Sequence, residues 1–279
     1  MSTIHKIITE EKYEKDMIVG IMQGTIDNLR AELRGENVVY LYVDNKSTRG
    51  VDLSIEDYGY EIRNTILSSE ADYNLTNLLI EVLLNITSGI LMNEDDEPIN
   101  GPYIYDEINI KKMMSHDAQS IIVLAKENYE VAIYGPIRMT YFGKRLVEEL
   151  ETFLDDLKTL SQKVFDIVLN VQYGLPEYEY GNIMAISKSD TDDEKKLCKL
   201  LTTETDYLIG KYDYIMLNRG EERMPILITN EILNSILPES WKLVDEFHVV
   251  APRLNESEWN NLISRATEFD LAEMVFDNR

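Results

Sequence analysis

The sequence is poor in cysteine and histidine, and both shortages exclude classes of site. It contains a single cysteine, Cys198, among 279 residues, so no internal disulfide can form. Its three histidines, His5, His116 and His248, lie far apart, and no two share helical spacing. We therefore expect neither a histidine-rich metal site nor a Ser-His-Asp triad. We predict His5 in a frayed terminus, His116 at the start of a helix, and His248 packed in an apolar strand.

Sequence signatures of common enzymes and membrane proteins are also missing. The chain has no GxxxxGK[ST] or GxGxxG nucleotide loop, and no HExxH, CxxC or GxSxG motif. No apolar run approaches the roughly 18–20 residues of a membrane helix. The first residues, MSTIHKIITEEKYEKD, lack the apolar core of a signal peptide. We therefore predict a cytoplasmic protein with no cofactor.

Positive charge is scarce. Lysine and arginine number 27 against 51 aspartates and glutamates, which gives a net charge of −24. Direct nucleic-acid binding needs a basic footprint, and anionic membranes repel an acidic protein, so both partners are excluded. The charge either serves solubility or favours a basic protein partner or nucleic-acid mimicry. The sequence alone does not choose between these interpretations.

Two acidic stretches carry oxygen ligands of the kind that calcium and magnesium prefer. They are NEDDE, residues 93–97, and SDTDDE, residues 189–194. The second resembles the start of an EF-hand loop, but Lys195 stands where that loop needs glycine and Leu201 where it needs glutamate. Neither stretch has a full ligand set, so we predict solvated loops and no metal.

The hydrophobic residues, 44% of the chain, are sufficient for a large core. Three runs of alternating apolar and polar residues over 38–66 predict a β-meander. Ser69 and Asp72 then have the spacing of a capping box, ahead of a helix for which Gly89 is the predicted C′ residue. Residues 117–127 are predicted to be helical, and YEVAIYG and IRMTYF to be paired strands. This order predicts an α+β fold with antiparallel meander sheets and helices packed on one face.

The longest predicted element is one central helix over residues 143–174. From Leu150 to Val171 the apolar residues recur at alternating spacings of 3 and 4, and the stripe widens towards its end. A widening stripe favours a buried helix over an exposed coiled coil. The predicted domains are an N-terminal α+β subdomain, residues 1–142, the connecting helix, residues 143–174, and a C-terminal α+β subdomain, residues 175–279.

In the C-terminal part we predict a mixed set of short elements. Thr191 and Glu194 have capping-box spacing ahead of a short helix that would carry Cys198 and end near Leu201. KYDYIML and MPILIT predict a hairpin, NEILNSIL a short helix, and FHVVAP a strand. Asn255 and Glu258 are expected to cap the final helix.

The heptapeptide DNKSTRG, residues 44–50, brings Lys46 and Arg49 together in an acidic chain. A phosphate site needs converging backbone N–H groups beside such cations. Asn, Ser and Gly are also turn formers, and the flanking residues form predicted strands. We predict a hairpin turn, and we keep a weak anion site at Lys46 and Arg49 as the alternative.

Tyrosine is frequent, with 17 residues, and it clusters near acids in YGLPEYEYGN and TDYLIGKYDYIM. Tyrosine offers a large contact area with few rotatable bonds. A possible interaction surface therefore comprises Tyr178, Tyr180, Tyr212 and Tyr214. The competing interpretation is that these tyrosines line strands in the core and at its rim.

Three stretches resemble an uncharacterised bacterial domain-of-unknown-function family of about this length. They are the NKSTRG hairpin with the strand and helix that follow it, the later YGPIRMTYF, and the terminal PRLNESEW. The sequence departs from the family pattern at Asn45, where that pattern has glycine. The resemblance implies no activity. It implies that Arg49 and Arg138 are structurally placed. Because the chain is so acidic, we expect each of them beside a carboxylate.

We therefore expect a non-enzymatic binding protein, such as an interaction, inhibitor or immunity-like protein, whose acidic, tyrosine-bearing surface meets a basic protein. The alternative is a hydrolase or transferase with a carboxylate-based site, because such carboxylates need not be close in sequence. A third hypothesis is a scaffold that oligomerises through the long helix. No catalytic residue is assigned.

Overall fold

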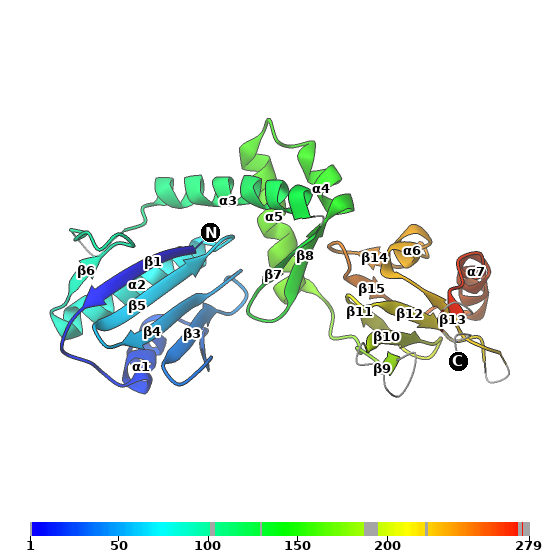
Figure 1. Ribbon diagram of the computed structural model, residues 1–279, viewed down its shortest axis with the longest axis horizontal. Helices are drawn as coiled ribbons and strands as arrows, with labels where there is room; N and C mark the ends of the chain where they lie inside the picture. Colours follow the sequence, from blue (N-terminus) through cyan, green and yellow to red (C-terminus); the bar gives the residue numbers. More distant parts are fainter. Residues whose placement is uncertain are drawn as a thin grey trace. The chain divides into compact units, whose positions relative to one another are not determined.

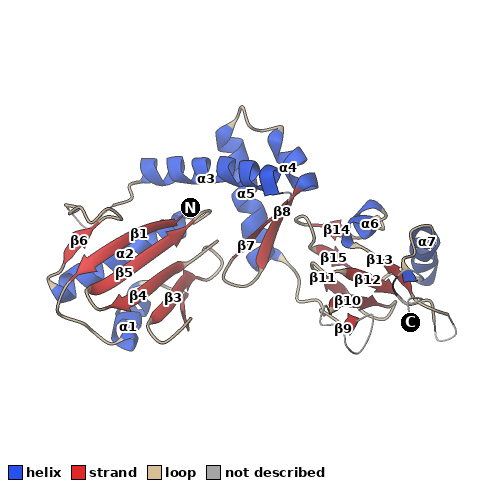
Figure 2. Ribbon diagram, viewed as in Figure 1, coloured by secondary structure: helices blue, strands red, loops and turns tan. Residues whose placement is uncertain are grey.

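The computed structural model describes residues 2–100, 104–128, 130–186, 195–220, 223–272 and 275. The chain forms two compact units, Met1–Gly174 and Leu175–Arg279 (Figure 1). Helices occur beside mostly antiparallel strands, which confirms the predicted α+β class (Figure 2). Within the described residues, no helix combines the length and the apolar character needed to cross a bilayer.

A six-stranded antiparallel sheet is the base of the N-terminal unit. Its spatial order is β2-β3-β4-β5-β1-β6. The predicted meander is confirmed as β3, β4 and β5. The strands are β1 (Ser2–Ile8), β2 (Leu29–Leu33), β3 (Val38–Val43), β4 (Val51–Glu56), β5 (Gly59–Thr65) and β6 (Ile90–Met92).

The first strand corrects the prediction that His5 lies in a frayed terminus. Strand β1 pairs with both β5 and β6, so its backbone has a hydrogen-bonded neighbour on each side. His5 is only 4% exposed, and its Nε2 lies 2.8 Å from the hydroxyl of Tyr105. Burial disfavours the charged imidazole and lowers the pKa of His5 to about 4.

Two helices cover this sheet. Helix α2 (Glu70–Thr87) lies across one face, and α1 (Lys15–Thr25) packs against α2 and β2 (Figure 1). The predicted capping box of Ser69 and Asp72 is confirmed. The helix ends at Thr87 with Ser88 as its C-cap, so Gly89 is at the predicted C′ position, although Ser88 is the residue in the left-handed region, at φ 52°. Gly89 allows the side chain of Ile7 to approach the backbone closely, since a Cβ at Gly89 would lie 2.6 Å from the Ile7 side chain.

The rest of the N-terminal unit forms a second core with its own hairpin. Apolar residues of three helices and the hairpin share this core, among them Ile121, Phe142, Leu146 and Val164. The elements are α3 (Glu107–Asn128), β7 (Glu130–Tyr134), β8 (Met139–Gly143), α4 (Lys144–Glu151), α5 (Leu157–Leu169) and the π-helical turn η1 (Asn170–Gly174). The predicted pairing of β7 with β8 is confirmed. His116 lies inside α3, so the prediction that it starts a helix is wrong.

The predicted single helix over residues 143–174 is also wrong. The chain breaks between α4 and α5, where Asp156 accepts the N–H of Thr159 at 3.1 Å and caps α5. Leu150 on α4 and Leu160 on α5 face the same core. The apolar rhythm therefore continues across the break, and spacing alone does not reveal it.

Among its described residues, the C-terminal unit has two small sheets and the helices α6 and α7. The sheets have the orders β13-β12-β10-β9 and β11-β15-β14. The elements are β9 (Ile183–Ile186), β10 (Lys196–Leu201), β11 (Tyr207–Ile209), β12 (Tyr214–Leu217), β13 (Ile226–Ile228), α6 (Asn230–Ser235), β14 (Lys242–Leu243), β15 (Val249–Ala251) and α7 (Glu256–Thr267). The predicted hairpin, the short helix, the strand and the capping box of Asn255 with Glu258 are confirmed.

One C-terminal element is a strand where a helix was predicted. β10 pairs with β9 on one side and β12 on the other, so it lies inside its sheet. Cys198 is a fully buried residue of this strand, and burial raises the pKa of its thiol to about 11. The predicted caps Thr191 and Glu194, with the whole SDTDDE stretch, lie outside the described residues.

Candidate functional site

The loop DNKSTRG connects β3 to β4, as predicted, and it wraps around a carboxylate of the same chain. The carboxylate of Asp72 accepts four backbone N–H groups, at 3.2 Å from Thr48, 3.1 Å from Arg49, 3.0 Å from Gly50 and 2.8 Å from Ser69. Three consecutive N–H groups that converge in this way form an anion-binding nest. The nest is therefore occupied by Asp72.

The four N–H groups around the Asp72 carboxylate are here called the Asp72 cage, and the local backbone geometry makes it possible. Asn45 and Gly50 adopt φ values of 62° and 65°, a region that Asn and Gly enter most easily. A Cβ on Gly50 would lie 2.5 Å from the ring of Tyr40, so only glycine fits there. The side chain of Arg49 turns towards β5, where its Nε donates to the Thr65 hydroxyl at 2.9 Å. Burial lowers the pKa of Arg49.

The second family-like stretch, Gly135 to Arg138, is held by Gln172 of η1. The Gln172 side-chain oxygen accepts the N–H groups of Ile137 and Arg138 at 2.9 and 3.0 Å, and its amide nitrogen donates to the Arg138 carbonyl at 2.7 Å. The Arg138 guanidinium in turn donates to the carbonyls of Val171 and Gln172. The β7–β8 turn is thus fixed to the end of α5.

One hydrogen bond joins the two motifs. The hydroxyl of Tyr173, next to Gln172, donates to the Ser47 carbonyl of the DNKSTRG loop at 2.9 Å. Ser47 itself is fully buried, and its hydroxyl accepts the N–H of Val43 at 2.8 Å. The loop, the start of α2 and the end of α5 therefore form one connected framework.

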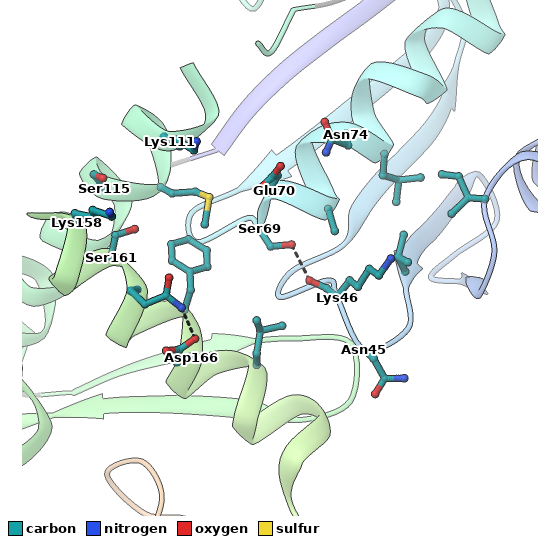
Figure 3. A pocket seen from close by; sticks show the side chains of 18 residues that line it. Asn45, Lys46, Ser69, Glu70, Asn74, Lys111, Ser115, Lys158, Ser161 and Asp166 are labelled. Carbon is teal, nitrogen blue, oxygen red and sulfur yellow. Dashed lines mark hydrogen bonds between the residues drawn. The ribbon is translucent and has the colours of Figure 1, made fainter. Parts of the chain in front are cut away.

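This framework borders an open cleft of about 1050 Å³. Figure 3 shows the cleft with Lys46 and Ser69 on one side and Lys111, Ser115, Lys158 and Ser161 on the other. Its apolar lining comprises Ile26, Val43, Ala71, Leu75, Met114, Phe165 and Leu169. Its remaining polar lining includes Asn45, Glu70, Asn74, Gln162 and Asp166.

The charges in the cleft come from three lysines and two carboxylates. Lys111 pairs with Glu107 one helical turn earlier, and both side chains are mostly exposed. Asp166 accepts a hydrogen bond of 2.7 Å from Gln162. Cations therefore outnumber carboxylates here, whereas in the whole chain carboxylates outnumber cations.

The predicted site residues lie in different places. Lys46 lines the cleft, while Arg49 reaches Thr65 instead. Tyr180 is 47% exposed, and Tyr178 is partly buried. Tyr212 and Tyr214 are partly buried against two different apolar clusters of the C-terminal unit. The four tyrosines are therefore not gathered into one exposed patch.

The acidic stretch NEDDE is a closed turn. The side-chain oxygen of Asn93 accepts the N–H groups of Asp95 and Glu97 at 3.0 and 2.8 Å, and Asp96 pairs with Lys6. Among the described residues, no three His, Cys, Asp or Glu side chains are grouped as a metal site.

Several notable residues carry no signal in the local sequence. Lys111, Lys158 and Ser161 reach the cleft from α3 and α5, and only the scarcity of cations could have drawn attention to the two lysines. In the C-terminal unit, His248 is buried as predicted, with Nδ1 2.8 Å from the buried carboxylate of Asp245, but it lies just before strand β15 and not in it. Lys199 is fully buried there, and its amine has no hydrogen-bond partner among the described residues.

Comparison with known proteins identifies a family and no activity. Residues 3–174 match the family described as a domain of unknown function, DUF4299. No curated protein and no solved structure matches the chain. The matched region spans the N-terminal unit, with both motifs and the cleft. The chain belongs to the DUF4299 family.

Proposed function

We propose that this member of the DUF4299 family is a non-enzymatic binding protein, and that its N-terminal unit receives a ligand in the cleft between the start of α2, α3 and α5. The cleft itself is the observation that carries the proposal. Its volume of about 1050 Å³ is comparable with known ligand sites, which range from about 300 to 1,000 Å³. Its lining combines apolar side chains with a few polar groups, as ligand sites do.

The walls of the cleft are held by contacts that exist before any ligand arrives. The Asp72 cage ties the first turn of α2 to the DNKSTRG loop. Tyr173 ties the same loop to the end of α5. A preorganised site binds more tightly, because little conformational entropy is lost when the ligand enters.

A cleft-filling variant tests this proposal. Ser115 lines the cleft from α3, and the neighbouring Lys112 is exposed outside it. Purified wild type, Ser115→Trp and the matched control Lys112→Trp would be incubated with extract of the source cells and analysed by native mass spectrometry. We expect wild type and the control to retain a species that Ser115→Trp loses while keeping its thermal stability. Identical retention by all three proteins would refute the cleft as the binding site.

The acidity of the whole chain supports a basic protein as partner of the intact molecule. Even if every lysine and arginine were paired, the carboxylates would still be in excess by 24. Such a field accelerates association with basic proteins and is screened by salt. Tyr180, 47% exposed, offers an aromatic contact. The proposed compartment is the cytoplasm, consistent with the unpaired Cys198.

Affinity capture at two salt concentrations tests the partner. The tagged protein should retain one basic protein at low salt and release it at high salt. Retention that does not respond to salt would contradict an electrostatic interface. Tyr180→Ala should weaken the captured complex, whereas Tyr134→Ala, an exposed tyrosine of the other unit, serves as the matched control.

One observation favours an enzyme as the second candidate. Glu70 and Asp166 line the same cleft, and a carboxylate pair is the machinery of many hydrolases and transferases. Wild type would be assayed against ester, glycoside and phosphoester substrates, beside Glu70→Gln and Asp166→Asn. Turnover that both substitutions abolish would establish catalysis, and turnover unaffected by both would exclude this pair.

A further inference from the structure

We infer that the cleft of the N-terminal unit selects an organic phosphate with an apolar or aromatic body. This inference rests on the proposed binding function and names the class of ligand. It follows from three features of the cleft: the lysines on facing walls, a hydroxyl without a protein partner, and an apolar part of the lining.

The lysines give the cleft a charge opposite to that of the protein. Lys46 enters from the β3–β4 loop, Lys111 from α3, and Lys158 from the first turn of α5. Within the described residues, neither Lys46 nor Lys158 takes part in a salt bridge. The exposed Lys111–Glu107 pair contributes little stability, so Lys111 can turn to a ligand at small cost. Three ammonium groups suit a phosphate, which carries −1.5 to −2 charges at pH 7.

Ser161 adds a hydrogen-bonding group that the protein itself leaves unused. The residue is 9% exposed and lines the cleft, and its hydroxyl has no hydrogen-bond partner among the described residues. The Ser161 oxygen is not one of the fully buried, unpartnered side-chain atoms, so it is open to the cleft and a ligand can replace the water that solvates it. Figure 3 shows Ser161 on the same wall as Lys158 and Ser115. A phosphate oxygen placed there would accept from Ser161 and from the lysine.

The apolar part of the lining determines the chemistry of the ligand beyond its phosphate group. Met114 and Phe165 line the cleft together with Leu75 and Leu169, and Phe165 is 4% exposed. Methionine adapts its shape to flat rings and alkyl groups. An inorganic ion would leave this surface in water, whereas an organic body would cover it. We therefore expect an organic phosphate to bind more tightly than pyrophosphate or inorganic phosphate.

The test uses Met114 as a reporter inside the cleft. Intact protein labelled with ¹³C at its methionine methyl groups would be titrated with phenyl phosphate, AMP and ATP. Phenol and adenosine are the matched neutral probes, and pyrophosphate is the matched inorganic probe. The Met114 signal is assigned with Met114→Leu. We expect saturable shifts of the Met114 methyl with at least one organic phosphate, and binding at least about tenfold weaker for its neutral counterpart.

Paired variants locate the charge. Lys46→Ala with Lys158→Ala should raise the Kd of the organic phosphate at least about tenfold. The control pair, Lys112→Ala with Lys144→Ala, removes two exposed lysines that do not line the cleft, and should change the Kd less than about twofold. Ser161→Ala should weaken binding while leaving the other methionine signals in place.

Each remaining outcome overturns the inference. If phenol or adenosine shifts Met114 as strongly as its phosphate, the cleft binds ligands without selecting the anion, and the proposed function stands alone. If the control pair weakens binding as much as the cleft pair, the charge effect is not local. If no phosphate shifts Met114, the inference fails, and the Ser115→Trp comparison decides separately whether the cleft binds anything.

Discussion

A carboxylate as completely buried as that of Asp72 needs protein donors in place of water. The DNKSTRG loop supplies three N–H groups, and the helix cap supplies the fourth. The hydroxyls of Thr48 and Ser69 lie 3.1 and 3.0 Å from the same group. The loop thus has the chemistry of an anion site, and its ligand is a side chain from the next helix.

Replacing this carboxylate should loosen the loop. Asp72→Asn presents an amide to donors that need acceptors, and we expect a loss of at least about 2 kcal/mol in unfolding free energy. Hydrogen exchange of the amides at residues 48–50 should accelerate more than exchange elsewhere in the N-terminal unit. Glu70→Gln, at the neighbouring exposed carboxylate, is the control. Equal exchange in the two variants would show that the cage does not order the loop.

Lys199 gives the C-terminal unit a pH dependence of known sign. Burial of its amine lowers the pKa to about 8 from an ordinary value of 10.5. Between these two values the unfolded chain binds more protons at this amine than the folded one, so Lys199 makes stability rise with pH. Above about pH 9 the raised pKa of Cys198 acts in the opposite direction, so the rise is expected between about pH 8 and 9. At lower pH the charged amine is a constant cost.

Lys199→Met should remove that slope and stabilise the unit at pH 7 by about 1–3 kcal/mol. Both tryptophans of the chain, Trp241 and Trp259, belong to the C-terminal unit and are buried. Urea unfolding followed by tryptophan fluorescence therefore reports on this unit alone. Lys196→Met, on the same strand and only partly buried, is the matched control. A parallel pH slope in wild type and Lys199→Met would refute the assignment to Lys199.

Among the elements, the turn between β7 and β8 depends on one side chain of η1. Gln172 is 1% exposed and satisfies two N–H groups and one carbonyl of that turn. Gly135 is required beside it, because a Cβ there would lie 2.3 Å from the Gln172 amide carbon. The spacing of glycine and arginine in this motif therefore reflects the attachment of a hairpin to a helix end.

Gln172→Ala should destabilise the N-terminal unit by about 2 kcal/mol or more, since it leaves buried donors unpaired. Gln162→Ala, which removes only an exposed pair with Asp166, should cost less than about 0.5 kcal/mol. Gly135→Ala should reproduce the effect of Gln172→Ala, because it displaces the same amide. Thermal unfolding followed by far-UV circular dichroism measures all three. If the Gln172 contacts did not contribute to stability, Gln172→Ala, Gly135→Ala and Gln162→Ala would have similar melting temperatures.

The elements that could be predicted from sequence are those with local signals. The capping boxes at Ser69 and Asn255 and the alternation of the meander depend on neighbours a few residues apart. The break at Asp156 was missed because both helices face one core and keep its period. Strand β10 was missed because pairing on both sides buries Lys199 as well as Cys198, which hides the alternation.

The candidate site depends on contacts between distant residues, and sequence predicted little of it. The turn at DNKSTRG and the cap at Asp72 were each predicted. The hydrogen bonds between them were not, because they join residues that are 22 to 24 positions apart. Lys46, Lys111 and Lys158 come together only through the packing of α3 and α5. No local pattern marks such a cleft, since its lining comes from α2, α3, α5, the β3–β4 loop and residues Ile26 and Val43, which lie far apart in the sequence.

At the scale of the whole molecule, the family match and the division into units agree. The match ends at residue 174, where the N-terminal unit ends. Each unit has its own apolar clusters, so each satisfies a condition for independent folding. The helices α4 and α5 belong to the N-terminal unit and do not form a separate connecting segment.

Residues 1–174 should therefore fold alone. We expect a cooperative thermal transition by circular dichroism, and methyl signals of Met114 at the positions found in the full chain. The complementary fragment, residues 175–279, should show buried tryptophan fluorescence. A fragment 1–174 without a cooperative transition would mean that the family region needs the C-terminal unit to fold.

The burial of Cys198 makes the chain convenient for optical work. Maleimide dyes react with thiolates, and a thiol with a pKa of about 11 is ionised to only about one part in ten thousand at pH 7. A substitution such as Lys112→Cys on the exposed surface of α3 would carry an ordinary thiol and react far faster. Fluorophores can therefore be attached at chosen positions with the natural cysteine left in place, and each dye reports from one known residue.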